Sequence, residues 1–432
     1  LFTSCTSSEE ESKLPQSCHG LNLTELPQRW DEAIPLGNGL TGGLLWQKDG
    51  KLRLAIDRAD LWDLRPVEAF KSPDHTYRFI CDQVRKKDMR PVYALIDDRT
   101  ANDPAPTKIP AGALEFDIHK LGKVKKVALD VATAVCTVLW ENGVQARFFI
   151  PAEGNGGRFR FENLPDTLSP ELLAPLYQGR VAESDHQPGV NDLSALGYQS
   201  GTITSPAPGR LLYRQQAWGD VSYEIGLQWE RPHTGVLEGG YYVISKGTWY
   251  SGDTGRADHL NISFDEALAS HQNWWEQYWK QSSVSLPDTL LERQWYLEMY
   301  KFGAASRRKA PPICLQAIWT ADNGQTPPWR GDFHSDLNTQ LSYWAGYTAN
   351  HLEESAVFTD WLWKIKENSE QFTRQFFQVE GLNVPCIATL TGQPIGGWNP
   401  YSHSPTTAGW LSYHFYQQWK YGMDSQFLKE RA

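Results

Sequence analysis

Residues Ser263 to Trp279, S-F-D-E-A-L-A-S-H-Q-N-W-W-E-Q-Y-W, mark the point at which the hydrophobic pattern of this 432-residue chain changes. Ser263 and Glu266 have the spacing of a capping box, in which two side chains satisfy free amide groups at a helix start. Leu268, Trp275 and Trp279 then fall on one helical face. The pattern predicts a helix that begins after Ser263 and buries this face.

Short segments of alternating polarity precede this helix. Residues 127–139 alternate apolar with smaller or polar side chains, and Asn142-Gly143 then turns the chain into residues 146–150, as in a β-hairpin. Residues 221–229 and 241–245 also have strand patterns. Many short strands separated by Gly, Pro and Asp turns predict an antiparallel β-sandwich over residues 27–262.

Helical spacing continues after residue 279. A second helix is expected from Asp288, with Leu291, Trp295 and Phe302 on its buried side, and further helices at 337–351, 356–377 and 407–419. We therefore divide the chain into a polar tether (1–26), a sandwich (27–262), a helical linker (263–306) and a helical domain (307–432). Long polar loops between the later helices are typical of functional segments.

Composition and charge exclude some function classes. A net charge of −10 argues against nucleic acid as a partner, because phosphate binding needs a basic surface. No metal or cofactor is expected, since no cysteines or histidines have zinc-site spacing. We expect core thiols, with at most one or two disulfides, from the scattered cysteines Cys5, Cys18, Cys81, Cys136, Cys314 and Cys386.

The first residues, L-F-T-S-C-T-S-S-E-E-E, resemble the cleavage box and acidic tether of a bacterial lipoprotein, with Cys5 as the lipidated residue. No other stretch approaches the about 20 apolar residues of a membrane-spanning helix. We therefore expect an exported periplasmic or outer-surface lipoprotein of a bacterium, which contacts the membrane only through a lipid anchor at Cys5.

The segment Trp319 to Trp344, W-T-A-D-N-G-Q-T-P-P-W-R-G-D-F-H-S-D-L-N-T-Q-L-S-Y-W, combines aromatic, carboxylate, amide and imidazole side chains. Sugars stack on tryptophan and need paired hydrogen-bond donors and acceptors, so this mixture suits a carbohydrate pocket. Asp336 and Asn338 lie at or just inside a predicted helix start. An alternative is that Ser335 or Asp336 only caps that helix.

Three blocks resemble glycoside hydrolase family 95, which belongs to the six-hairpin glycosidase superfamily and includes α-L-fucosidases and α-L-galactosidases. They are W-D-E-A-I-P-L-G-N-G-L-T-G-G-L-L-W (30–46) with D-R-A-D-L-W (57–62), L-Q-A-I followed by the segment above (315–344), and S-P-T-T-A-G-W-L-S-Y-H-F-Y-Q-Q-W-K-Y-G-M-D-S-Q-F-L-K (404–429). The resemblance implies a β-sandwich, a helical linker and an (α/α)6 catalytic barrel. It also implies inverting hydrolysis of glycan side chains.

The family holds its attacking water with two Asn side chains, and these positions fall on Asp336 and Asn338. The first is Asp where fucosidases carry Asn. Because a carboxylate accepts a proton directly, our hypothesis is that Asp336 is the base and Asn338 orients the water. The helix-cap interpretation of Asp336 stays open at this point.

Further candidate substrate-binding residues lie near this motif or on a later loop. Trp329 and His334 are expected to line the sugar subsite, and Asp332 either to bind a hydroxyl or to pair with Arg330. Trp398 and His403 lie on a loop of the kind that rims such barrels. The family's His-rich loop is not recognisable, so the sugar itself is left open. Trp62 is expected in the core, and Asn38 in a turn.

The resemblance places the general acid and a distant Asp in later barrel loops than any in this chain. Residues 307–432 have room for only a few of about twelve barrel helices. We therefore expect a fragment that is inactive by itself. The alternatives are a non-catalytic carbohydrate-binding surface protein and a glycoside phosphorylase. A carboxylate at residue 336 argues against the phosphorylase, which needs a basic site for phosphate.

Overall fold

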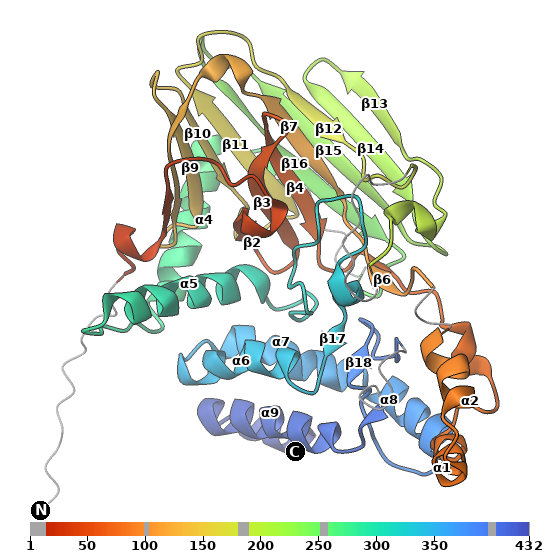
Figure 1. Cartoon of the computed structure of the whole chain (residues 1–432). Helices are drawn as coiled ribbons and strands as arrows, with labels where there is room; N and C mark the ends of the chain where they lie inside the picture. The colour runs from red at the N-terminus through yellow and green to blue at the C-terminus, as the bar shows by residue number, and fades with distance from the viewer. Residues whose placement is uncertain (1–13, 99–102, 180–189, 251–257, 396–402, 432) are drawn as a thin grey trace, which may run out of the picture.

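The computed structural model describes residues 14–98, 103–179, 190–250, 258–395 and 403–431. Layered strands form the upper part of the molecule in Figure 1, and helices form the lower part. The strands come mainly before residue 250 and the longer helices after it, so the predicted β-then-α order is confirmed. That residues 307–432 begin an (α/α)6 barrel stays a prediction.

Two antiparallel sheets face each other in the upper part. The larger has the order β1 (Leu21–Leu23), β8 (Val124–Asp130), β9 (Val135–Trp140), β10 (Gln145–Phe149), β11 (Gly156–Glu162), β16 (Leu237–Lys246), β15 (Ser222–Glu230), β14 (Arg210–Gln216), β13 (Thr202–Ala207). The smaller has the order β12 (Pro170–Leu173), β7 (Gly112–Asp117), β4 (Lys51–Arg58), β3 (Thr41–Lys48), β2 (Ile34–Gly37). Their facing sides form one hydrophobic core.

Local patterns predicted two turns of this region correctly. Asn142-Gly143 joins β9 to β10, and Asn38 accepts two backbone amide hydrogen bonds at the turn between β2 and β3. The apparent single strand at 127–139 is two strands, β8 and β9. The chain turns between them because the Asp130 carboxylate accepts hydrogen bonds from the Ala132 amide and the Thr133 hydroxyl, at 3.0 and 2.8 Å.

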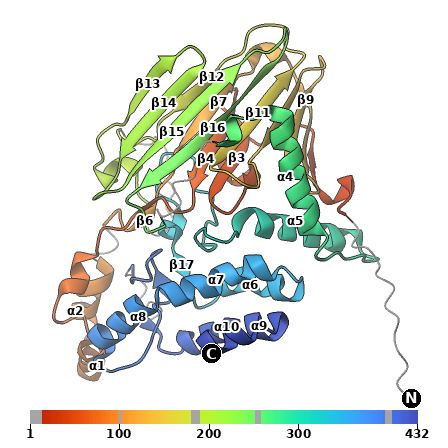
Figure 2. The same cartoon turned by 180° about the vertical axis from the view of Figure 1, so that it is seen from behind.

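Helix α4 (Phe264–Trp279) begins with the predicted capping box, which is confirmed. It lies across the outer face of the larger sheet, against β11 (Figure 2). Trp275 and Trp279 are fully buried, and each such side chain contributes about 2–3 kcal/mol of burial free energy. The Trp279 indole also donates a 2.9 Å hydrogen bond to the Val131 carbonyl. Helix α4 is therefore fixed to the sandwich by both packing and hydrogen bonding.

Helix α5 (Thr289–Ala305) starts at the predicted Asp288 cap, but its buried face was predicted wrongly. Leu291 is 58% exposed, whereas Tyr296, Met299 and Tyr300 are buried. Apolar and aromatic residues lie on several sides of this helix, so its spacing alone does not identify the face that packs. Trp295 is partly buried, and Phe302 is buried as predicted.

The lower layer contains α6 (Asn338–Thr348), α7 (Leu352–Lys364), α8 (Lys366–Phe372), α9 (Thr407–Gly422) and α10 (Ser425–Arg431). Helices α6, α7 and α9 contact one another. The helix predicted at 356–377 is interrupted at Ile365, between α7 and α8. None of the helices in the described ranges has the length and apolar character needed to cross a membrane.

A helical excursion leaves the sandwich between two short paired strands, β5 (Trp62–Asp63) and β6 (Thr107–Lys108). It contains α1 (Tyr77–Lys86) and α2 (Arg90–Val92), and in both views it lies beside α8 (Figures 1 and 2). The Thr76 hydroxyl caps α1 by accepting the Phe79 amide at 3.2 Å. This excursion brings residues close to the sandwich strands into contact with the helical layer.

Candidate active site

The first half of the segment predicted as a sugar pocket is docked on the sandwich. The Trp319 indole donates to the Leu36 carbonyl at 2.9 Å, and the Thr320 amide donates to Asp57 at 3.0 Å. Asp322 accepts hydrogen bonds from Arg53 at 2.6 and 2.7 Å and from the Trp46 indole at 2.9 Å. These polar and aromatic groups are therefore used for packing, and the carbohydrate interpretation does not apply to residues 319–322.

A strained turn follows this docked part. Trp329, Arg330 and Gly331 have φ angles of 55°, 60° and 64°, in the left-handed region. Such a conformation costs a non-glycine residue about 1–2 kcal/mol, and residues of this kind gather at functional sites. The turn is held because the buried Arg330 donates to the Ala105 carbonyl at 3.2 Å, while its own carbonyl accepts the Thr107 hydroxyl at 3.2 Å.

The turn leads into a short strand, β17 (Phe333–His334), which pairs with β18 (Ile387–Ala388). The Ser335 amide extends this pairing with a 2.7 Å hydrogen bond to the Cys386 carbonyl. The Phe333 ring lies between those of Trp361 and Trp62, with centroids 4.6 and 5.9 Å away. Trp62 is buried, as predicted. Phe333 therefore anchors the strand, and the neighbouring residues, which alternate in direction, point elsewhere.

Asp332, just before this strand, and His334 within it form a hydrogen-bonded pair in which Asp332 is buried and His334 is partly exposed. A short hydrogen bond joins His334 Nδ1 to Asp332 Oδ1. Burial raises the pKa of Asp332 to about 6, against the opposing effect of the His334 hydrogen bond. Burial lowers the pKa of His334, but the Asp332 hydrogen bond and the charges of Asp332 and Asp336 outweigh it, so the pKa is raised overall. Asp332 has no exposed surface and orients His334. The charge of Arg330 also lowers the pKa of Asp332, in line with the predicted alternative that these two residues pair.

Asp336 and Asn338 follow at the start of α6. Leu337 occupies the N-cap position, and no side chain caps this helix, so the helix-cap interpretation of Ser335 or Asp336 is wrong. Asp336 is half-buried, and its Oδ1 is shielded from solvent without a hydrogen-bond partner in the described chain. Asn338 is exposed. A shielded carboxylate oxygen without a partner is unusual, and it calls for an explanation beyond local structure.

The remaining predicted residues have different positions. Trp329 is half-buried and its ring meets that of His334 edge-on, with centroids 5.8 Å apart, so these two lie together. His403 was expected on a rim, but it is buried against Phe376, with ring centroids 4.1 Å apart. Burial lowers the pKa of His403 to about 3, which is typical of a core histidine. Trp398 lies outside the described residues.

A polar chain beneath the candidate site was not predicted. The buried Gln340 amide donates to the Ser335 carbonyl at 2.7 Å, and Gln340 Oε1 lies 3.1 Å from His414 Nε2. His414 Nδ1 in turn lies 3.0 Å from the Tyr347 hydroxyl. Burial lowers the pKa of His414 to about 4, so the imidazole is neutral at pH 7. Gln340 and Tyr347 are seven residues apart, a helical spacing that could have indicated a shared buried face.

Within the part of the chain that the structure describes, no group of three or more His, Cys, Asp and Glu side chains could hold a metal ion. The cysteines in these ranges are all free thiols.

Comparison with known proteins gives a family match for the helical part. Residues 257–432 match the family model described as the glycosyl hydrolase family 95 catalytic domain. Alpha-L-fucosidase 2 of Arabidopsis thaliana is 25% identical over 146 residues, covering 33% of this chain. Probable alpha-fucosidase A of Aspergillus niger is 24% identical over 143 residues, covering 30% of this chain. The matched region spans 17% of the length of each relative.

Among solved structures, a family GH92 inverting mannosidase from Bacteroides thetaiotaomicron matches 67% of this chain and 39% of its own. With a TM-score of 0.31 and 10% identity, this likeness supports no conclusion about fold or function. The match to the family model is more informative than this structural likeness, because the matched residues include the whole candidate site from Trp329 to Asn338 and helices α4 to α10. Residues 257–432, less than half of the chain, are therefore similar in sequence to the catalytic domain of glycosyl hydrolase family 95.

Proposed function

We propose that the whole protein is an inverting exo-glycosidase that removes α-L-fucosyl or α-L-galactosyl ends from glycans. The observation that carries this proposal is the Asp336 carboxylate, half-buried and unpaired beside the start of α6. The family match supports a glycoside hydrolase, and the fucosidase names of the curated relatives support the choice of sugar.

In the proposed reaction Asp336 accepts a proton from a water molecule as the water oxygen attacks the anomeric carbon. The bond to the leaving oxygen breaks, and a general acid on the other face of the sugar protonates that oxygen. Asn338 orients the water through its exposed side-chain amide. The resemblance implies that the general acid belongs to a later barrel loop.

We assign the sugar-facing wall to His334 and Trp329. His334 is held by the buried Asp332 carboxylate, so its ring has a fixed orientation. Trp329 is held by the strained turn and offers an aromatic surface beside the imidazole. An imidazole next to an aromatic face suits a sugar with both hydroxyls and an apolar side.

We also propose that α6, α7 and α9 belong to an (α/α)6 barrel. Large apolar side chains on these helices are exposed, which is unusual for a finished surface. They include Leu337 (44%), Leu341 (46%), Trp344 (36%), Tyr413 (43%) and Tyr416 (46%). Further barrel helices would cover them.

Export as a lipoprotein anchored through Cys5 is a separate proposal, since Cys5 lies outside the described residues. Labelling with a radioactive fatty acid tests it in cells that express the full-length protein with Cys5 or with Cys5→Ala. Label in the Cys5 protein that is absent from the variant supports the anchor. Equal labelling, or none in either protein, contradicts it.

The function is tested with the full-length protein, p-nitrophenyl α-L-fucoside and fucosylated oligosaccharides. NMR of the first product should show β-L-fucose, as inversion requires. Asp336→Asn should lower kcat about 100- to 10,000-fold, the usual contribution of a general base, because the amide cannot take the proton. Asp49→Asn, at an exposed turn, is the matched control.

Three outcomes separate the alternatives. Turnover retained by Asp336→Asn contradicts Asp336 as the base. A rate that depends on phosphate, with release of a sugar phosphate, favours a phosphorylase. Glycan binding without turnover in the full-length protein favours a carbohydrate-binding surface protein.

A further inference from the structure

The outer face of the larger sheet carries a second groove, distant along the chain from Asp336. Two adjoining hollows of about 500 and 160 Å³ share Arg210, Gln228 and Leu260 as lining residues. They lie over β14, β15 and β16, between the β13–β14 hairpin and the loop before α4. From this groove we infer a binding site for a neutral oligosaccharide that stacks on Tyr242.

The strand register arranges the groove in rows. Leu212, Gly226 and Tyr242 lie opposite one another and form an apolar row. The next row is Arg210, Gln228 and Gly240, which supplies a guanidinium and an amide. These residues point outward, because the alternate positions of β15 and β16 are buried in the core.

Tyr242 lies flat on the sheet. A Cβ atom on Gly226 would come within 2.2 Å of the Tyr242 ring, so the ring occupies the space that any larger residue would fill. The Tyr242 hydroxyl donates to Glu224 at 2.7 Å, and Glu224 also accepts from Arg214 at 2.8 Å. The ring is thus fixed in position while it is only half-buried. A fixed, flat aromatic ring is the surface on which the C–H face of a pyranose stacks.

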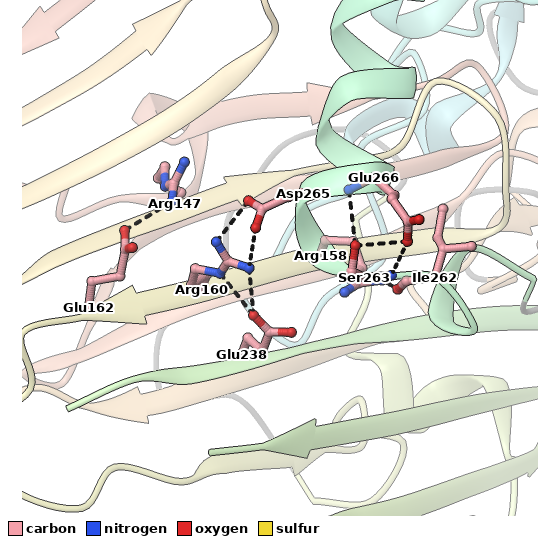
Figure 3. Close-up of polar contacts among 9 residues, drawn as sticks. All are labelled: Arg147, Arg158, Arg160, Glu162, Glu238, Ile262, Ser263, Asp265 and Glu266. Atoms are coloured by element: carbon pink, nitrogen blue, oxygen red, sulfur yellow. Dashed lines mark hydrogen bonds and ion pairs between the residues drawn. The ribbon is translucent and has the colours of Figure 1, made fainter. Parts of the chain in front are cut away.

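One wall of the groove is rigid. Arg158 donates to the carbonyl of His259 at 2.6 Å. It also donates to the carbonyl of Ile262 at 3.0 Å (Figure 3). Arg160 lies between Glu238 and Asp265, at 2.7 and 2.9 Å, and so ties the start of α4 to the sheet (Figure 3). A preformed wall lowers the entropy cost of binding.

The polar groups of the groove suit a neutral ligand. Arg210 and Asn261 are exposed, and none of the described residues pairs with their side chains, so both are available to sugar hydroxyls. The positive charges of Arg158, Arg160, Arg210 and Arg214 are balanced by Glu224, Glu230, Glu238 and Asp265. A polyanionic glycan would meet no net positive field here.

The test is isothermal titration of the full-length protein with two neutral probes, cellohexaose and lacto-N-tetraose, and with heparin as an anionic probe. All proteins carry Asp336→Asn, which removes the proposed catalytic base, so this result does not depend on the proposed function. Binding of one neutral probe identifies a glucan or a galactoside as the class. Tyr242→Ala should then weaken binding about tenfold, the effect of about 1.4 kcal/mol of lost contact.

Matched variants separate stacking from folding. Tyr242→Phe keeps the ring but loses the hydrogen bond to Glu224, so it should bind more tightly than Tyr242→Ala. Gly226→Ala should displace the ring and weaken binding. Arg210→Ala removes an exposed, unpaired group and should weaken binding without affecting the fold. Tyr93→Ala removes an exposed tyrosine elsewhere and is the control. No binding of either neutral probe at millimolar concentration, preference for heparin, or equal binding by Tyr242→Ala and Arg210→Ala overturns the inference.

Discussion

Acidification should destabilise the contact between the helical excursion and the lower layer, through His75 and His403. The His75 ring stacks on Phe70, with centroids 4.3 Å apart, and meets the His403 ring edge-on at 5.5 Å. Both side chains are buried, at 8% and 4% exposure. His75 Nε2 and both ring nitrogens of His403 are buried without hydrogen-bond partners, so no acceptor stabilises a proton on them.

The size of the effect follows from the pKa values. Burial lowers the pKa of His75 from 6.5 to about 4. Burial, with a smaller contribution from His75, lowers that of His403 from 6.5 to about 3. The neutral forms are favoured in the folded protein, so the stability is fully present above pH 6.5 and is lost as the pH falls below it. At pH 5 each histidine should cost about 2 kcal/mol, or about 4 kcal/mol together.

The assay is urea unfolding of the full chain at pH 7 and pH 5, followed by tryptophan fluorescence. Other buried histidines also destabilise the protein in acid, so the informative quantity is the difference between the parent and the His75→Phe, His403→Phe double variant. That variant should lose about 4 kcal/mol less than the parent between the two pH values. His233→Phe, at an exposed position, is the control. If the parent and the double variant lose equal stability, the two imidazoles are not held neutral by burial and the reasoning is wrong.

Two further substitutions test how the sandwich holds the segment that carries the candidate site and how it holds helix α4. Arg53→Ala should leave Asp322 without its main partner. It should lower the free energy of unfolding in urea by about 2 kcal/mol and lower kcat in the full-length protein. An unchanged kcat would show that this contact does not position the candidate site. Trp279→Ala should lower the free energy of unfolding by about 3–5 kcal/mol by calorimetry, because it leaves a cavity between α4 and the sandwich. Trp218→Ala, at 41% exposure, should change it by less than about 1 kcal/mol.

The features predicted correctly depend on residues close together in the chain. The capping box joins Ser263 to Glu266, and Asn142-Gly143 forms its hairpin turn with adjacent residues. Trp62 was expected in the core because large aromatic residues are commonly buried. Each of these predictions used residues within a few positions of one another, or the general tendency of aromatic residues to be buried. Local hydrophobic patterns also predicted the order of strands and helices.

The errors involve partners that are far away in the chain. Asp322 lies in the segment that was interpreted as a carbohydrate pocket, but its partner Arg53 is 269 residues earlier. His403 was placed on a rim, whereas its neighbours Phe376 and His75 come from η9 (Thr373–Phe377) and from the loop before α1. The pairing of Asp332 with His334 could have been proposed from their spacing, since alternate residues of a strand share a face.

These contacts give the sandwich a direct part in building the segment that carries the candidate site. The left-handed conformations of Trp329 and Arg330 oppose the turn by about 1–2 kcal/mol each. The sandwich offsets this cost on both sides of the turn, through Asp322 with Arg53 and through the Thr107 hydroxyl with the Arg330 carbonyl. Without those contacts the turn has little reason to persist, and His334 and Asp336 would lose their fixed position. The sandwich therefore supports the segment that carries the candidate site.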